Sequence, residues 1–464
     1  MLTYDFGKRG NLSLYEYLYQ SIKEDISSGR LKAKEKLPSK RELASHLQVS
    51  IKTVENAYAQ LLLEGYIYAE EKRGYYVSKI SGVQTNRSVL EPFVSTQKEE
   101  EYLADFTANN INYEKFPFSM WAKVLRETLT DYDTTLLQIV PYNGVEKLRV
   151  EIAKYLYRYR GMQVSPDNII IGAGTEYLYS KLILLLGENA RYAVENPGFR
   201  KITKIYDSLR AKWTRVDIDE QGLKVEELKQ TNANVVHVSP SHHYPMGLVM
   251  PIARRQELLN WAEEETERYI IEDDYDSEFR FSGRPIPAMQ SMDRHHRVIY
   301  MNTFSKTLVP SIRVSYMVLP QKLMERWESI MNFYSCTVSG FEQYALASFM
   351  EKGYFERHIR RMTNYYKQQR EKIMGIFRES ALGKAGIISE DEAGTHFLYK
   401  AESPLSDIEI KWAAKERGIL ISALSEYCFA NAEKYKGIFI INYSDIGEEQ
   451  LREAIERLEE IFLE

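Results

Sequence analysis

The chain has 464 residues with 44% hydrophobic content, which allows about three domains or lobes and excludes a disordered, fibrous or disulfide-stapled protein. No apolar run approaches the roughly 18 residues of a membrane helix, and residues 1–10 lack the apolar stretch of a secretory signal, so we expect a cytoplasmic protein. The net charge of −5 is uneven, because residues 1–80 carry 13 Lys and Arg against 10 Asp and Glu. A basic N-terminal part suggests a nucleic-acid contact, with a merely solvated surface as the alternative.

Residues 1–80 have the pattern of a small helical module followed by a hairpin. The predicted elements are a helix over 14–28, a short helix that begins at the Ser39 capping box, a helix that Ser50 caps and Gly65 ends, and strands over 66–70 and 75–79. This order predicts a winged helix-turn-helix. A three-helix packing module without a ligand is the alternative.

A winged helix-turn-helix places the start of its recognition helix in the major groove and its wing on the backbone or minor groove. The polar face of the Ser50-capped helix and the turn between the two strands therefore supply the candidate DNA contacts. These are Ser50, Lys52, Thr53 and Asn56 on the helix and Lys72 and Arg73 in the wing.

The sequences over 37–44, 49–54 and 73–77 closely resemble the GntR family of bacterial repressors. The resemblance covers about the first 80 residues and implies that Arg41 binds DNA, with Ser39 of the same motif as a further candidate contact. Family members often have arginine where this chain has Ile51 and Glu55. The guanine contacts of those arginines are therefore absent, and the operator sequence does not transfer.

Residues 81–103 have the composition of a solvated linker, so we expect a domain boundary there and a large domain over 104–464. Beyond the linker, short apolar runs alternate with longer helical patterns, which is typical of an α/β fold with a mostly parallel sheet. The expected strands lie over 169–171, 192–194, 235–238, 269–271, 298–300 and 314–318.

Three turns that follow these strands contain candidate ligand-binding residues. A glycine-rich turn over 172–176 opens a helix and can present backbone N–H groups to an anion. An acidic stretch over 272–276 places carboxylates at the end of a strand, and residues 303–307 place hydroxyls beside Lys306, with Arg313 seven positions later. Each piece alone has an ordinary alternative: a plain turn, solvated carboxylates or a solvated lysine.

Together the three pieces fit pyridoxal 5'-phosphate, which needs a lysine amine, a carboxylate for its ring nitrogen and an anion cradle for its phosphate. In this order they resemble fold-type I aminotransferases. With the N-terminal module, nearly the whole chain resembles the MocR/GabR subfamily of GntR regulators, with close matches over 239–245, 272–279 and 303–308. The resemblance implies a homodimer, head-to-tail, whose aminotransferase-like domain binds the cofactor and an effector.

The resemblance also assigns roles to single residues. Lys306 matches the Schiff-base lysine, Asp273 the ring-nitrogen carboxylate and Tyr275 the phenol near the ring hydroxyl. The remaining cofactor contacts that it implies are Gly174, Thr175, Thr303, Ser305 and Arg313 around the phosphate, Phe199 against the ring, and His242 near the ring hydroxyl. No metal site is expected, since Cys336 and Cys428 lack metal-ligand spacing.

Two departures from the family pattern bear on activity. Ile440 stands where active aminotransferases have the arginine that binds the substrate carboxylate, which leaves Arg200 or Lys201 as the nearest candidates for an effector contact. The loop over 140–144 also departs from the family motif, with Tyr142 as a substitute for a tyrosine that reaches the partner's phosphate.

These observations favour a regulator that binds operator DNA and senses an amine, an amino acid or pyridoxal phosphate itself. We expect its large domain to form aldimines with little or no transaminase turnover. An active aminotransferase with an appended DNA-binding module is the alternative, and Ile440 argues against it. A DNA-binding protein whose large domain is only a dimerisation scaffold is disfavoured, because Lys306, Asp273 and Arg313 are all present.

Overall fold

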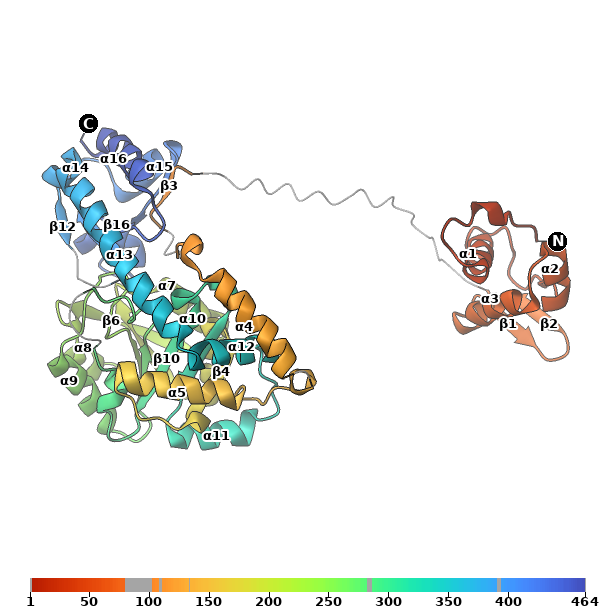
Figure 1. Cartoon of the computed structure of the whole chain (residues 1–464), viewed down its shortest axis with the longest axis horizontal. Helices are drawn as coiled ribbons and strands as arrows, with labels where there is room; N and C mark the ends of the chain where they lie inside the picture. The colour runs from red at the N-terminus through yellow and green to blue at the C-terminus, as the bar shows by residue number, and fades with distance from the viewer. Residues whose placement is uncertain are drawn as a thin grey trace. The chain divides into compact units, whose positions relative to one another are not determined.

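The computed structural model describes residues 2–79, 102–107, 111–132, 134–281, 286–389 and 394–463. The chain forms two compact units, 1–99 and 100–464 (Figure 1). The predicted linker over 81–103 lies outside the described residues except for its last two positions. Among the helices of the described part, none combines the length and the apolar character needed to cross a bilayer.

The first unit is a three-helix module with a hairpin. Its elements are the 3-10 turn η1 (Phe6–Lys8), the helices α1 (Leu14–Ser27), α2 (Lys40–Leu47) and α3 (Ile51–Leu63), and the antiparallel strands β1 (Ile67–Glu70) and β2 (Gly74–Val77). The Ser39 hydroxyl accepts a hydrogen bond from the Glu42 N–H at the start of α2, and the Ser50 hydroxyl accepts one from the Thr53 N–H at the start of α3. The core side chains Leu18, Val54 and Leu61 have no exposed surface. The predicted winged helix-turn-helix is confirmed.

The second unit is built around an eight-stranded sheet. In spatial order its strands are β4 (Ile169–Ala173), β11 (Val314–Val318), β10 (Val298–Thr303), β9 (Tyr269–Asp273), β8 (Val235–Val238), β5 (Arg191–Asn196), β6 (Lys212–Asp219) and β7 (Gly222–Leu223). The pairs from β10 to β6 are parallel, whereas β11 is antiparallel to both of its neighbours and β7 is antiparallel to β6. The predicted mostly parallel sheet is confirmed, and β9 and β10 extend further toward the site residues than the apolar runs indicated.

Helices cover both faces of this sheet, because alternate strand residues point to opposite sides. One face carries the side chains of Ile169, Ile171 and Tyr300 and is covered by α4 (Phe118–Asp131), α5 (Glu146–Arg160), α8 (Val225–Lys229), α9 (Ile252–Glu263) and α12 (Gly340–Glu351). The other face carries Ile170, Ile271 and Met301 and is covered by α6 (Thr175–Leu186), α7 (Arg200–Ser208) and α11 (Gln321–Met331). Both faces are therefore buried, as parallel strands require.

The long helix α13 (Tyr354–Glu379) runs from the large sheet to a smaller C-terminal layer (Figure 1). That layer is a four-stranded antiparallel sheet in the order β12 (Ile387–Ser389), β13 (His396–Lys400), β16 (Ile438–Asn442) and β15 (Ser422–Ala423). Its other elements are β3 (Ala104–Asp105) paired with β14 (Ile419–Leu420), and the helices α14 (Ala381–Ala385), α15 (Asp407–Glu416) and α16 (Glu448–Phe462). Their apolar faces form a separate core with the C-terminal part of α13.

Candidate functional site

The candidate cofactor residues meet at one edge of the large sheet. Asp273 ends β9 and Thr303 ends β10, and these strands run parallel with Met301 opposite Asp273. The glycine-rich turn after β4 reaches the same edge, because β4 and β10 are both antiparallel to the strand between them. Sheets of this kind bind ligands outside the carboxyl ends of their strands. Strand register therefore explains why segments far apart in the sequence form one site.

Two side chains that the sequence analysis missed hold the Asp273 carboxylate. Tyr179 on α6 donates a hydrogen bond of 2.8 Å to Asp273 Oδ2, and His237 Nε2 on β8 lies 3.6 Å from the same oxygen. Burial raises the pKa of Tyr179 well above its ordinary value, so its hydroxyl remains a donor. These two contacts orient the side chain of Asp273, a residue that is only 9% exposed.

Lys306 lies in a single helical turn, α10 (Phe304–Thr307), that follows β10 directly. Burial lowers the pKa of its ammonium to about 8, while the charge of Asp276 acts in the opposite direction. Close by, His242 Nδ1 is 2.7 Å from Asp276 Oδ2 and 3.3 Å from the Tyr275 hydroxyl. An amine with a lowered pKa has a larger neutral fraction at neutral pH, which nucleophilic attack requires.

The hydroxyls beside Lys306 have different environments. Thr303 Oγ1 accepts a hydrogen bond from the Ser305 N–H at 3.1 Å and one from the Ser315 hydroxyl at 2.8 Å. Thr303 therefore fixes the turn that carries Lys306, and a phosphate contact from it stays a prediction. Ser305 Oγ is shielded from solvent and has no hydrogen-bond partner among the described residues, so it can bind a ligand oxygen.

An anion cradle lies at the start of α6. Gly174 has a φ of +91°, and a Cβ at this position would lie 2.3 Å from Arg313 Nη2, so glycine is needed for the close approach of the guanidinium. Arg313 Nη2 is 2.8 Å from Glu176 Oε2, and Lys201 Nζ binds the other oxygen of the same carboxylate. Burial opposes the charged form of Glu176, but Lys201, the backbone N–H and Arg313 together lower its pKa to about 2. The cradle thus stabilises a negative charge.

Aromatic and histidine side chains line the mouth of the site. Phe199 is 45% exposed, and its ring lies edge-to-face with Tyr244 at 6.0 Å. The Tyr244 hydroxyl is 3.0 Å from the Tyr427 hydroxyl, and the His396 ring is 5.3 Å from the His242 ring. Both Tyr427 and His396 come from the C-terminal layer, so this wall is assembled from two parts of the second unit.

Ile440 provides no polar group to this mouth. It is 2% exposed and packs in an apolar cluster with Leu398 and Leu424. Of the two residues predicted to contact an effector, Lys201 pairs with Glu176 in the cradle, and Arg200 Nη2 lies 3.4 Å from the Cys428 carbonyl oxygen. An effector contact from either residue stays a prediction.

Some of the missed residues had a signal in the sequence. His237 and Glu195 are polar residues inside otherwise apolar strand sequences, and each lies buried at the carboxyl end of its strand. A polar residue in a buried strand needs a partner, which makes it a candidate site residue. Tyr179 and His396 had no such signal. Tyr179 arrives through the packing of α6 on the large sheet, and His396 comes from β13 of the C-terminal layer, where its Nε2 lies 3.0 Å from the Pro245 carbonyl oxygen.

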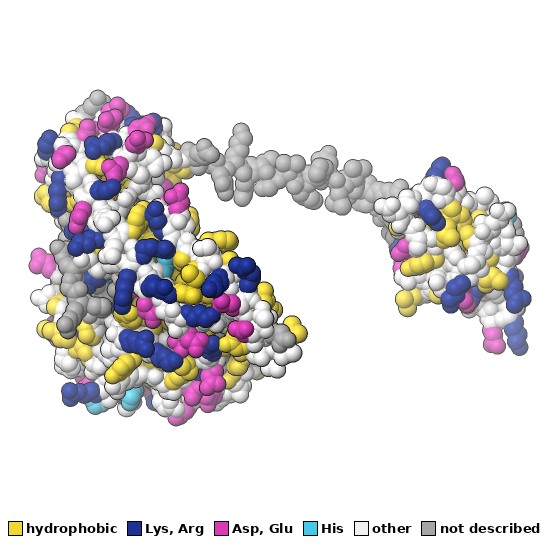
Figure 2. All heavy atoms as spheres, in the orientation of Figure 1, with side chains coloured by type: hydrophobic (Ala, Val, Ile, Leu, Met, Phe, Trp, Pro, Cys, Tyr) yellow, Lys and Arg dark blue, Asp and Glu magenta, His cyan; other side chains and the backbone are white. Residues whose placement is uncertain are grey.

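In the first unit, the predicted DNA contacts lie at the starts of α2 and α3 and in the hairpin turn. Arg41, Lys52, Asn56, Lys72 and Arg73 are all exposed. Lys and Arg side chains gather at the hairpin end of this unit in Figure 2, with acidic side chains beside them. Glu55 Oε1 lies 3.1 Å from Lys40 Nζ, and Glu55 Oε2 lies 3.4 Å from Lys52 Nζ. The Glu55 carboxylate therefore neutralises part of the positive charge beside the recognition helix.

The residues at the sheet edge fit pyridoxal phosphate. The Glu176 carboxylate occupies the cradle as an anion. The shielded Ser305 hydroxyl belongs to the helical turn that carries Lys306. An oriented carboxylate, Asp273, and an amine with a lowered pKa complete the set that this cofactor requires.

Two family models match the chain. Residues 14–77 match the family described as bacterial regulatory proteins, gntR family, and residues 101–458 match aminotransferase class I and II. The second match covers most of the chain and coincides with the second unit.

Relatives match along nearly the full length. The HTH-type transcriptional regulator YdeL of Bacillus subtilis is 35% identical over 97% of this chain and 96% of its own length. The probable rhizopine catabolism regulatory protein MocR of Rhizobium meliloti is 32% identical over 100% of this chain and 96% of its own. A kynurenine aminotransferase structure from Pyrococcus horikoshii, 24% identical, covers 78% of this chain and 91% of its own with a TM-score of 0.68, which shows the fold of the second unit.

The neighbouring carboxylates Asp273 and Asp274 are expected to respond differently to substitution. Asp274 forms a buried ion pair of 2.9 Å with Arg160, whereas Asp273 faces Tyr179 and His237. Asp274→Asn should lower the free energy of unfolding by about 3–5 kcal/mol, because it leaves a buried guanidinium without its counter-charge. Asp273→Asn should leave thermal unfolding nearly unchanged and weaken pyridoxal phosphate binding. Equal losses of stability in the two variants would contradict this assignment.

Proposed function

Because the chain belongs to the GntR-family regulators whose second part is of aminotransferase class I and II, we propose that it binds operator DNA through its first unit and a ligand-responsive cofactor through its second. The cofactor is pyridoxal 5'-phosphate, and the protein works in the cytoplasm, where bacterial operators lie. One combination of features supports the proposal. The recognition helix has an exposed polar face, Lys306 and Asp273 are both present in the second unit, and Ile440 stands in place of a carboxylate-binding arginine.

When bound, pyridoxal phosphate supplies an aldehyde that forms a covalent bond with an amine and a ring that accepts electrons. In this chain, Lys306 is the attaching amine, and its lowered pKa supports that role. Asp273, held by Tyr179, is the partner of the ring nitrogen. We assign Tyr275 and His242, which lie 3.3 Å apart, to the ring hydroxyl. Arg313 and Ser305, with Gly174 and Thr175, are the proposed phosphate contacts.

A regulator needs a ligand with different affinities for two states of the protein, and it gains nothing from releasing a product. The effector we propose is an amine, an amino acid or pyridoxal phosphate itself. Two relatives have names that concern the metabolism of a compound: MocR is named for rhizopine catabolism, and PdxR of Corynebacterium glutamicum, 29% identical over 89% of both chains, for pyridoxine biosynthesis. Arg200 and Lys201 are the proposed contacts for an anionic group on the effector.

The second unit also exposes apolar side chains that support association with a second copy of the chain. Large apolar side chains on and around α4, α11 and α12 are exposed, and yellow side chains follow the edge that carries α4 in Figure 2. They include Phe118, Leu129, Leu137, Ile139, Ile330, Phe333 and Phe341, of which Leu137 and Ile139 are 80% and 87% exposed. An exposed apolar surface of this kind marks a protein interface, and we propose a homodimer.

Replacing Lys306 tests the cofactor proposal. Lys306→Ala should abolish the visible absorbance of the protein-bound cofactor, because the attaching amine is lost. It should also abolish any change in DNA affinity that amines or pyridoxal phosphate cause in the wild-type protein. The measurement is a titration of the protein with pyridoxal phosphate or an amine. It follows both the absorbance and the binding to the DNA upstream of the gene that encodes this protein. Lys204→Ala, on α7 outside the site, is the control. Multiple turnovers per second with a common amino acid and a keto acid would favour an aminotransferase instead.

Two substitutions in the first unit separate phosphate contacts from base contacts. Arg41→Ala should lower affinity across DNA sequences and flatten the salt dependence by about one unit. Asn56→Ala should cost about 1–3 kcal/mol on the specific operator alone. Lys23→Ala serves as the control, because its ammonium pairs with Glu64 at 2.7 Å. Unchanged affinity of Arg41→Ala at low salt would exclude this orientation on DNA.

The apolar surface predicts the oligomeric state. Ile139→Asp should convert a dimer to a monomer in sedimentation equilibrium, because it places a charge within the proposed apolar contact. The control is Ile252→Asp, because Ile252 is 66% exposed and lies on α9, outside the elements that carry the apolar surface. A wild-type protein that remains monomeric at micromolar concentration would overturn the proposal.

A further inference from the structure

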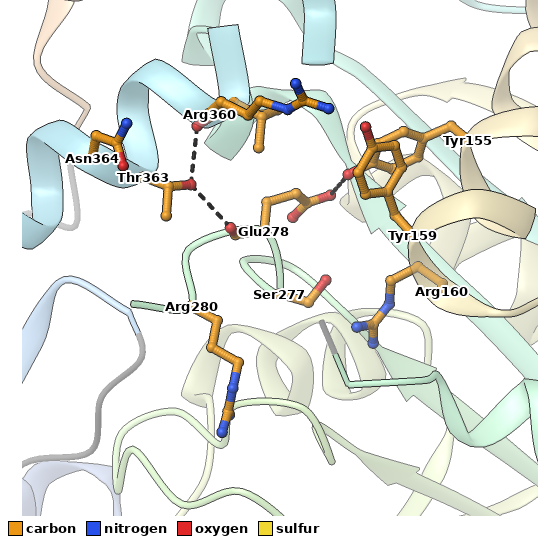
Figure 3. A pocket seen from close by; sticks show the side chains of 10 residues that line it. Tyr155, Tyr159, Arg160, Ser277, Glu278, Arg280, Arg360, Thr363 and Asn364 are labelled. Atoms are coloured by element: carbon orange, nitrogen blue, oxygen red, sulfur yellow. Dashed lines mark hydrogen bonds between the residues drawn. The ribbon is translucent and has the colours of Figure 1, made fainter. Parts of the chain in front are cut away.

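A cavity of the second unit is lined by charged residues that contacts within the chain already hold. It has a volume of about 380 Å³ and lies between α5 and α13 (Figure 3). Arg160 pairs with Asp274 at 2.9 Å, and the Tyr155 hydroxyl donates a hydrogen bond of 3.1 Å to Glu278 Oε1. The Thr363 hydroxyl donates to the Glu278 carbonyl oxygen at 3.3 Å. Because Arg160 and Glu278 have these partners, their charges do not identify a ligand for the cavity.

The first unit, by contrast, exposes an apolar side chain that its own core does not use. Ile51 is the first residue of the recognition helix α3, directly after the capping Ser50, and it is 50% exposed. The helix packs on the core through its buried side chains, which are Val54, Ala57, Tyr58 and Leu61. Single exposed apolar residues are common on protein surfaces. The exposure of Ile51 is therefore informative only together with its position.

Ile51 lies on the side of α3 that carries Glu55, because residues four positions apart on a helix are neighbours. Glu55 Oε1 lies 3.1 Å from Lys40 Nζ at the start of α2. The same ammonium lies 5.6 Å from the centroid of the Tyr75 ring on β2. The starts of α2 and α3 and a strand of the hairpin therefore meet around this side of the recognition helix.

This position fits a contact with base edges. In a helix-turn-helix, the N-terminal residues of the recognition helix contact the bases in the major groove. The side chain of Ile51 has only C–H groups, so it neither donates nor accepts a hydrogen bond. Among the groups that base pairs present in the major groove, the C5 methyl of thymine is the apolar one. An isoleucine at the start of α3 therefore matches thymine.

Glu55 disfavours guanine beside Ile51. Hydrogen bonds from Lys40 and then from Lys52 lower the pKa of the Glu55 carboxyl, so this group is an anion at neutral pH. Guanine presents two acceptors, O6 and N7, in the major groove. The carboxylate repels these acceptors, and the side chain of Ile51 would leave them without a hydrogen bond. Charge and polarity on this side of α3 thus select against the same base.

We propose that Ile51 is a specificity-determining residue for operator DNA and that it contacts the C5 methyl of one thymine in the major groove. The contact removes two apolar groups from water, which is favourable. It assigns an A·T pair to the operator position opposite the start of α3. This inference rests on the proposed binding of operator DNA through the first unit.

Replacement of single thymines by deoxyuridine tests the proposal, because deoxyuridine lacks only the C5 methyl and forms the same base pair. The probe is a duplex that the full-length protein enriches from random-sequence DNA, and footprinting defines the positions that the protein covers. At one covered thymine, the replacement should weaken binding about fourfold, the factor that corresponds to burial of one methyl-sized group. At that position, 5-methylcytosine paired with guanine should bind more tightly than cytosine, because it restores the methyl group.

Substitution of Ile51 connects this effect to the side chain. Ile51→Ala should weaken binding to the thymine duplex and show no further loss with deoxyuridine, because the two changes remove the same contact. Its thermal unfolding should match that of the wild type, since Ile51 lies outside the core. Leu63→Ala is the matched control. Leu63 is 82% exposed at the other end of α3, and this variant should keep the sensitivity to deoxyuridine.

The outcomes separate this inference from the function on which it rests. A protein that enriches a duplex but responds to no deoxyuridine replacement would overturn the inference alone. The same holds for an Ile51→Ala variant that loses as much affinity with deoxyuridine as the wild type does. If the full-length protein enriches no duplex, the proposed function fails and the inference fails with it.

Discussion

The buried ion pair between Arg160 and Asp274 is the interaction on which the arrangement of the candidate site depends. Both side chains are almost fully buried, and the guanidinium also donates to the Ser241 hydroxyl at 2.7 Å. A buried charge is costly unless it is paired and hydrogen-bonded, so this contact constrains the end of α5, the residue after β9 and the loop that carries His242. Because successive residues at a strand end face opposite sides, Asp274 turned toward Arg160 leaves Asp273 turned toward Tyr179 and the cofactor edge.

The anion cradle and the mouth of the site have opposite electrostatic characters. Arg313, Lys201 and the start of α6 stabilise the Glu176 carboxylate strongly, which is what a phosphate group needs. At the mouth, Phe199, Tyr244 and Tyr427 present aromatic surface, and Ile440 is packed into an apolar cluster. Among the described residues, Ile440 gives this mouth no guanidinium that could bind a substrate carboxylate, which supports the proposal that the site senses a ligand.

Regulation in such a chain requires that ligand binding in the second unit alter the DNA affinity of the first. A ligand shifts an equilibrium only by its difference in affinity between two states, so the relevant contacts are those that change between states. The mouth is assembled from the large sheet and the C-terminal layer, with Tyr244 from one and Tyr427 and His396 from the other. A ligand bound between these side chains would contact both the large sheet and the C-terminal layer. Ligand binding could therefore change the position of one relative to the other.

The sequence by itself determined the features that depend on local interactions. Capping serines, helical periodicity and the basic turn were sufficient for the winged helix, and the glycine turn, the acidic strand end and the lysine turn were sufficient to identify the cofactor class. Only the tertiary structure decided the partners of these residues. Tyr179 reaches Asp273 across 94 positions, Glu176 meets Arg313 across 137, and Ile440 became apolar core through its packing against Leu398 and Leu424. Such contacts depend on strand order and register, and no short-range pattern in the chain encodes which buried side chain will lie beside which.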